Sequence, residues 1–154
     1  MKINFKKLLM YLGITLGVGA LAAFFTMNSM DIYSKINRPA LAPPAIVFPI
    51  AWTILYSLMA ISAYIVSESD CENKESALTS FYVQLAVNFV WPLIFFNLQA
   101  FLVSLLWLVL LVVLVIIMII KFYRCKPISA YLQIPYLLWL LFATYLNFSI
   151  YIMN

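Results

Sequence analysis

Four long segments of this chain carry no charged residue: Leu8–Met30, Pro39–Ser67, Ser76–Ile120 and Pro127–Asn154. Each of them is long enough to cross the hydrocarbon core of a bilayer, about 30 Å thick, as an α-helix. The composition agrees, because 67% of the 154 residues are hydrophobic and only 9% are charged. Soluble domains are about half apolar and about a quarter charged. The sequence therefore predicts an all-α integral membrane protein that lies in a lipid bilayer.

The segment Ser76–Ile120 is too long for one span, because a single helix of this length would extend about 68 Å. Two amides lie close together within it, at Asn97 and Gln99, and mark the best place for a turn. We therefore predict a bundle of five transmembrane helices that forms a single domain, residues 1–154. The expected helices cover residues 8–28, 46–66, 78–97, 100–121 and 128–151.

The basic residues are divided unequally between the two ends of the predicted bundle. Only Lys35 and Arg38 fall at the end with the C-terminus. Seven fall at the end with the N-terminus, namely Lys2, Lys6, Lys7, Lys74, Lys121, Arg124 and Lys126. Because cytoplasmic loops carry the excess of Lys and Arg, we expect the N-terminus in the cytoplasm and the C-terminus outside a bacterial cell membrane. Scattered in this way, the basic residues indicate topology and do not form a surface for nucleic acid.

The chain has no histidine, which excludes His-ligated metal sites and His general-base catalysis. Its two cysteines, Cys71 and Cys125, fall on the predicted cytoplasmic side, where reducing conditions argue against a disulfide. Two thiols without histidine do not make a zinc site, so we predict no metal and no cofactor. The first hydrophobic segment has an alternative interpretation as a cleaved signal peptide. We expect it to remain as a span, because its uncharged run is longer than a usual signal sequence.

By these boundaries, no charged residue lies inside a helix, which disfavours charge-driven transport because such transporters need an ionisable group in the membrane. The helices carry aromatic rings and neutral amides instead. Trp52 and Tyr56 share one helix face, and two longer stripes follow helical spacing. These stripes are Gln84, Asn88, Trp91 and Phe95, and Tyr136, Trp139, Ala143 and Asn147.

The stripes have two interpretations that the residues alone leave open. Facing inward, they would line one pocket for a large, flat, apolar ligand. Alternatively, the aromatic residues anchor the helices at the membrane interfaces and the amides hold helices together. Trp107 has no polar partner on its own face and is expected to contact lipid or another subunit. Gly13 and Gly17 permit close helix approach, and we expect them to serve internal packing, with dimerisation as the alternative.

The segment Ser29–Ala45 contains the proline-rich run Arg38-Pro39-Ala40-Leu41-Ala42-Pro43-Pro44. Proline stiffens a chain without forming a long helix. We predict that this loop between the first two helices is a lid over one mouth of the bundle, with a plain stiff connector as the alternative. Pro49, Pro92 and Pro135 are expected to bend three helices and so help to open a cavity.

Four motifs together resemble the translocator protein family, also called TspO/MBR, tryptophan-rich sensory proteins or peripheral benzodiazepine receptors. They are N-R-P-A-L-A-P-P at 37–44, A-W-T-I-L-Y-S-L-M at 51–59, Q-L-A-V-N-F-V-W-P-L-I-F-F at 84–96 and P-Y-L-L-W-L-L-F-A-T-Y-L-N at 135–147. Their order and spacing fit the family from about residue 10 to residue 150. Two departures stand out: many members have Trp and then Gly-Pro where this chain has Ile46–Ile50, and many have Trp where it has Phe89.

The resemblance implies a five-helix bundle, commonly a homodimer, that binds porphyrins such as protoporphyrin IX and drugs of the isoquinoline carboxamide and benzodiazepine types. By motif position, the implied ligand-binding residues are Tyr33, Pro43, Trp52, Tyr56, Asn88, Trp91, Trp139 and Ala143. Some bacterial members degrade protoporphyrin IX in light and oxygen, and the tryptophans implicated in this would be Trp52 and Trp139. Helix five ends without the basic residue of the animal cholesterol motif, which argues against cholesterol recognition of that kind.

Three functions follow as hypotheses: a porphyrin receptor, a light-dependent porphyrin-degrading enzyme, and a passive transporter of porphyrin across the membrane. The sequence shows no acid, base or nucleophile arranged for ordinary catalysis. Any chemistry must therefore come from the ligand.

Overall fold

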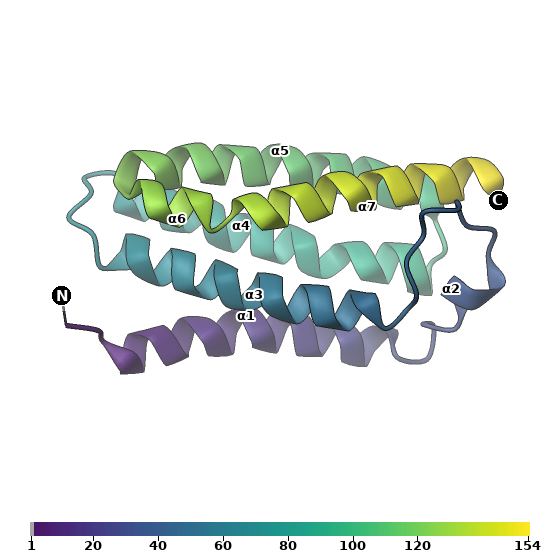
Figure 1. The fold of residues 1–154 in the computed structure, drawn as a ribbon, viewed down its shortest axis with the longest axis horizontal. Helices are drawn as coiled ribbons and strands as arrows, with labels where there is room; N and C mark the ends of the chain where they lie inside the picture. The colour runs from purple at the N-terminus through teal and green to yellow at the C-terminus, as the bar shows by residue number, and fades with distance from the viewer. Residues whose placement is uncertain (1) are drawn as a thin grey trace.

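The computed structural model describes residues 2–154, which form a bundle of helices without a β-strand. The long helices lie side by side, and the two termini lie at opposite ends of the bundle (Figure 1). In chain order the elements are α1 (Phe5–Thr26), α2 (Ile32–Lys35), α3 (Val47–Ser67), α4 (Lys74–Pro92), the π-helical turn η1 (Leu93–Asn97), α5 (Phe101–Cys125), α6 (Pro127–Tyr131) and α7 (Ile134–Met153).

Five segments are long and apolar enough to cross a membrane, which confirms the predicted count. They are Phe5–Thr26, Val47–Ser67, Lys74–Asn97, Phe101–Cys125 and Pro127–Met153. The predicted turn at Asn97–Gln99 is also confirmed, because α5 begins at Phe101 after a turn in which Gln99 has a positive φ of 52°. The side chain of Asn97 ties this turn to α1 by donating to the Phe25 carbonyl at 2.9 Å.

The prediction that no charge lies inside a helix is wrong at the helix ends. The helices extend beyond the apolar segments, so Lys7 lies in the first turn of α1, Lys74 begins α4, and Lys121 and Arg124 lie near the end of α5. Long basic side chains reach water from such positions, which makes them compatible with a membrane span. The central parts of the helices remain free of charge.

The apolar core occupies the half of the bundle that contains the N-terminus. Most of its fully buried side chains come from the second half of α3, the first half of α4, α5 and the first half of α7. They include Met59, Ala63, Phe81, Val115, Met118 and Phe122. In the other half the helices enclose a cavity.

Proline has different effects at the three positions that were expected to bend helices. Pro49 lies in the first turn of α3, and Pro135 in the first turn of α7, where proline is tolerated without a bend. The last span is nevertheless interrupted just before Pro135, because α6 ends at Tyr131 and α7 begins at Ile134. Pro92 ends α4 and is followed by the wider turn η1, in which the Leu98 N–H donates to the Leu93 carbonyl at 3.2 Å.

The expectation that Cys71 and Cys125 remain unpaired is wrong in this structure, where they form a disulfide with a Cα–Cα distance of 5.0 Å. The predicted reducing compartment does not determine whether the fold brings the two thiols within bonding distance. The loop between α3 and α4 and the end of α5 meet at the same end of the bundle, within the usual Cα–Cα range of a disulfide. An ion pair joins α1 to the end of α3 at the same end of the bundle, where Lys7 Nζ lies 2.8 Å from Glu68 Oε1.

The first hydrophobic segment is a full member of the bundle in the described structure. Helix α1 packs chiefly against α3. The Thr15 hydroxyl, fully buried, donates to the Tyr56 carbonyl at 2.9 Å. The expectation of internal packing is wrong for Gly13 and Gly17, because a Cβ at either position would meet no atom within 4 Å. Dimerisation through this face of α1 stays a prediction.

Candidate functional site

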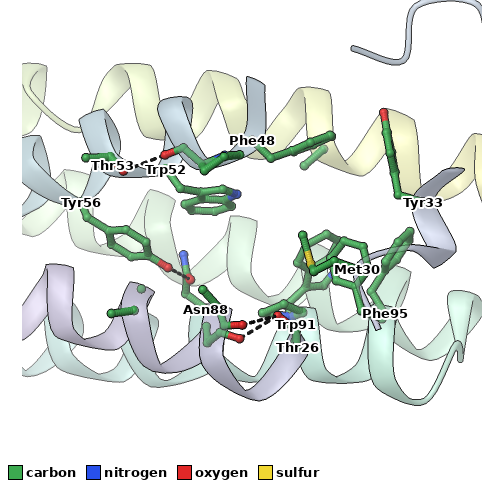
Figure 2. A pocket seen from close by; sticks show the side chains of 18 of the residues that line it. Thr26, Met30, Tyr33, Phe48, Trp52, Thr53, Tyr56, Asn88, Trp91 and Phe95 are labelled. Carbon is green, nitrogen blue, oxygen red and sulfur yellow. Dashed lines mark hydrogen bonds between the residues drawn. The ribbon is translucent and has the colours of Figure 1, made fainter. Parts of the chain in front are cut away.

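A cavity of about 380 Å³ lies between α1, α3, the end of α4 and α7 (Figure 2). Its lining is almost wholly apolar and includes no charged side chain. The lining residues are Leu16, Gly19, Ala20, Ala22, Ala23, Thr26, Met30, Tyr33, Phe48, Pro49, Trp52, Thr53, Tyr56, Asn88, Trp91, Pro92, Phe95, Phe96, Ala143, Leu146, Asn147 and Ile150. A concave apolar site with a few fixed polar groups is the usual form of a small-molecule site.

One chain of hydrogen bonds fixes the floor of the pocket. The Tyr56 hydroxyl donates to Asn88 Oδ1 at 2.8 Å, and Asn88 Nδ2 donates to the Tyr136 hydroxyl at 2.7 Å. That hydroxyl in turn donates to Gln84 Oε1 at 2.7 Å. All four side chains are buried. The chain therefore joins α3, α4 and α7 and satisfies amides that would be costly alone in an apolar interior.

A second group of hydrogen bonds holds one wall of the pocket in place. The indole N–H of Trp91 donates to Asn147 Oδ1 at 3.1 Å, and the Ser104 hydroxyl donates to the same oxygen at 3.0 Å. Asn147 Nδ2 donates to the Phe101 carbonyl at 3.0 Å. Asn147 thus orients the Trp91 ring and joins α4, α5 and α7.

Aromatic rings form the opposite wall. The Trp52 ring lies 5.4 Å from Tyr56 and 6.4 Å from Trp139 between centroids. Phe48 has its ring 5.9 Å from that of Trp139 and 5.1 Å from that of Tyr33, both in edge contacts. Trp52 and Phe48 line the cavity, whereas Trp139 does not line it and packs against both rings.

The loop between α1 and α3 covers one end of the pocket. Met30 and Tyr33 of this loop line the cavity, and Tyr33 is buried (Figure 2). The Tyr33 hydroxyl donates to the Pro43 carbonyl at 2.6 Å, which holds the proline-rich run against α2. These contacts favour the lid interpretation over a plain connector.

Six of the eight residues expected to bind ligand lie around this one cavity: Tyr33, Trp52, Tyr56, Asn88, Trp91 and Ala143. The other two, Pro43 and Trp139, do not line it. Pro43 accepts a hydrogen bond from the Tyr33 hydroxyl, and the Trp139 ring packs against that of Trp52. Lining residues that the sequence reasoning missed include Thr26, Met30 and Phe48. Phe48 lies in the segment Ile46–Ile50, where the chain departs from the family pattern. This departure was the one feature of the sequence that could have marked Phe48 as part of the pocket.

Trp107 has a polar partner on a neighbouring helix: its indole N–H donates to the Val87 carbonyl at 2.8 Å, so the ring packs toward α4. The ring is only partly buried, and its contact with lipid or another subunit stays a prediction. The acceptor is a backbone carbonyl, so the pattern of polar side chains in the sequence gives no sign of this hydrogen bond. Trp107 does not line the pocket.

Close packing of α1 against α3 depends on Gly19. A Cβ at this position would lie 2.6 Å from Cε2 and 2.8 Å from Cδ2 of Tyr56, closer than real atoms approach. Gly19 is therefore what lets Tyr56 turn its hydroxyl toward Asn88.

Replacing Gly19 with alanine is expected to displace the Tyr56 ring and to lower the free energy of unfolding by about 1–3 kcal/mol, as overpacking does. Thermal unfolding in detergent measures this. Gly13→Ala and Gly17→Ala are matched controls on the same helix. They meet open space and are expected to be neutral or to stabilise by up to about 1 kcal/mol through helix propensity. Equal behaviour of all three variants would contradict the assigned role of Gly19.

The chemical character of the pocket limits what it can do. The polar groups in its lining are indole, phenol, amide and hydroxyl groups, which bind and orient a ligand without supplying a strong acid or base. No group of three His, Cys, Asp or Glu side chains that could hold a metal ion occurs within residues 2–154. The site is therefore suited to binding, and a reactive ligand would have to bring its own chemistry.

The sequence of the chain matches the TspO/MBR family over residues 11–153. The chain belongs to the TspO/MBR family. It is 37% identical over 152 residues to the tryptophan-rich protein TspO of Archaeoglobus fulgidus, covering 98% of this chain and 99% of the relative. It is also 38% identical to the protein CrtK of Rhodobacter capsulatus, covering 88% and 85% of the two chains. The translocator protein of Homo sapiens is 32% identical, covering 77% of this chain and 72% of its own.

Membership of the TspO/MBR family agrees with the five apolar spans and makes this chain a multi-pass integral membrane protein. Its relatives include translocator proteins and tryptophan-rich sensory proteins, which supports a role as a membrane receptor or transporter.

Proposed function

We propose that this TspO/MBR protein is a membrane receptor for porphyrins, with protoporphyrin IX as the ligand to test first. The observation that carries the proposal is the pocket, in which Trp52, Trp91 and Phe48 offer ring faces and edges to a flat apolar molecule. Aromatic side chains are the usual contacts for such ligands. Drugs of the isoquinoline carboxamide and benzodiazepine types have the same flat apolar character and are proposed for the same pocket.

Replacing Trp52 with phenylalanine is expected to raise the Kd for protoporphyrin IX about fivefold to tenfold, because a smaller ring loses part of the contact. The measurement is a titration of the purified protein in phosphatidylcholine nanodiscs, followed by quenching of tryptophan fluorescence. Trp107→Phe is the matched control, since Trp107 lies outside the pocket, and its Kd is expected to stay unchanged. Failure of the unmodified protein to bind would contradict the receptor proposal.

Light-dependent degradation of the bound porphyrin by molecular oxygen is the second candidate function, and the position of Trp52 favours it. Its ring lies on the pocket surface with the Trp139 ring 6.4 Å away, so an excited porphyrin would take an electron from one of two neighbouring indoles and pass it to oxygen, whose reduced form would then attack the porphyrin. Illumination of the complex in air tests this by loss of porphyrin absorbance, with an oxygen-free sample as the control. If the absorbance of the bound porphyrin falls no faster than that of free porphyrin, the protein does not degrade its ligand and only the receptor proposal stands. Loss that persists in the double variant Trp52→Phe, Trp139→Phe would exclude the tryptophans from the reaction.

A further inference from the structure

The pocket itself contains no charged residue, so any charged group of a ligand must lie at its mouth. At the lid end of the bundle, residues 27–46 hold three charged side chains: Asp31, Lys35 and Arg38. Two of these neutralise one another, because Lys35 Nζ lies 2.7 Å from Asp31 Oδ2. The hydrogen bond from Lys35 holds the pKa of the Asp31 carboxyl below its ordinary value, which favours its carboxylate form.

Arg38 is the remaining charged side chain of residues 27–46, and it has no ion-pair partner within residues 2–154. Its guanidinium carbon lies 4.5 Å from the ring centroid of Tyr33. Tyr33 lines the cavity, so the guanidinium lies one aromatic ring away from the space that a ligand would occupy. A guanidinium on an aromatic face keeps its N–H donors free at its edges for a carboxylate.

The loop holds Arg38 in this position before any ligand binds. The neighbouring Asn37 is fastened to the end of α7: its N–H donates to Asn154 Oδ1 at 3.1 Å, and its Nδ2 donates to the Met153 carbonyl at 3.2 Å. Asn154 Nδ2 donates back to the Asn37 carbonyl at 2.9 Å. Such preorganisation lowers the entropy lost when the guanidinium binds a partner.

We propose that Arg38 is a carboxylate-binding residue at the mouth of the pocket, and that the ligand class is a flat apolar molecule with acidic groups along one edge. The inference rests on the proposed porphyrin-binding function and specifies it further. The apolar body of the ligand lies among the aromatic rings, and its carboxylate edge faces the lid. A neutral ligand of the same shape gains nothing from Arg38.

The test compares protoporphyrin IX, which has two carboxylates, with its neutral dimethyl ester. Both are titrated into nanodiscs of zwitterionic phosphatidylcholine with the unmodified protein, Arg38→Gln and Lys35→Gln. Lys35→Gln removes the same formal charge from the same loop and is the matched control. Arg38→Gln is expected to weaken binding of the diacid about fivefold to tenfold and to change binding of the ester less than twofold. Lys35→Gln is expected to change neither by more than about twofold.

Three results of these titrations would overturn either the role of Arg38 or the porphyrin-binding proposal. An equal effect of Arg38→Gln and Lys35→Gln on the diacid overturns the assignment of Arg38 while porphyrin binding stands. An equal loss for the diacid and the ester in Arg38→Gln overturns it as well, because the residue would then act on the loop and not on the carboxylates. Failure of both porphyrins to bind the unmodified protein overturns the proposed function itself. Unchanged thermal midpoints of the two variants confirm that the exposed substitutions leave the fold intact.

Discussion

Asn88→Leu is expected to lower the free energy of unfolding by about 2 kcal/mol and to weaken ligand binding about tenfold. Leucine is similar in size but supplies neither of the hydrogen bonds that Asn88 makes to Tyr56 and Tyr136. The buried Tyr56 hydroxyl then has no acceptor, and such an orphaned group costs about 1–3 kcal/mol. Denaturation in mixed detergent micelles measures the stability, and porphyrin titration measures the binding.

A double-mutant cycle shows whether the loss comes from the hydrogen bond. In a Tyr56→Phe background the hydroxyl is already absent, so Asn88→Leu is expected to cost clearly less than in the unmodified protein. Gln133→Leu is the control for burying leucine in place of an amide. Both polar atoms of the Gln133 side chain are buried without a hydrogen-bond partner within residues 2–154, so its replacement is expected to be neutral or stabilising. Additive effects of Tyr56→Phe and Asn88→Leu would contradict the proposed network.

The helical spacing of the inward stripes was enough to predict this network in part. Gln84 and Asn88 recur four residues apart, and an amide in an apolar span has to find a partner inside the bundle. The partners themselves were not predictable, because Tyr136 meets Asn88 only through the relative rotation of α4 and α7. The same limit explains why Trp139 shares the stripe of Tyr136 yet packs against Trp52 and does not line the cavity.

The spacing of glycines in α1 also does not predict which of them contacts a neighbouring helix. The small-xxx-small spacing of Gly13 and Gly17 is visible in the sequence, but spacing does not say which face of α1 meets α3. The structure uses Gly19, which falls outside that pattern. Helix limits were predicted to within a few residues, since the ends of apolar segments and the amides near residue 97 are local signals. Side-chain contacts between spans depend on rotation and depth, which one sequence does not encode locally.

Reducing the Cys71–Cys125 disulfide is expected to lower the thermal midpoint in detergent by roughly 5–10 °C. The bond joins residues 54 positions apart, and chain entropy sets an upper limit of about 4 kcal/mol on its contribution to stability. Cys71→Ser is expected to reproduce the effect of reduction, and adding reductant to that variant is expected to change nothing further. A midpoint that does not respond to reduction would show that the bond adds no stability.

The same cysteine pair tests the predicted orientation of the bundle. The bond lies at the end that carries seven of the nine basic residues, which the charge distribution places in the cytoplasm. Cytoplasmic thiols are kept reduced, so the predicted orientation requires that the bond is open in living cells and that acid-quenched cells yield both cysteines reactive to maleimide. Membranes oxidised after isolation are then expected to contain the bond, because the fold already holds the two residues 5.0 Å apart at Cα. A bond that is complete in growing cells would place this end in an oxidising compartment and reverse the predicted topology.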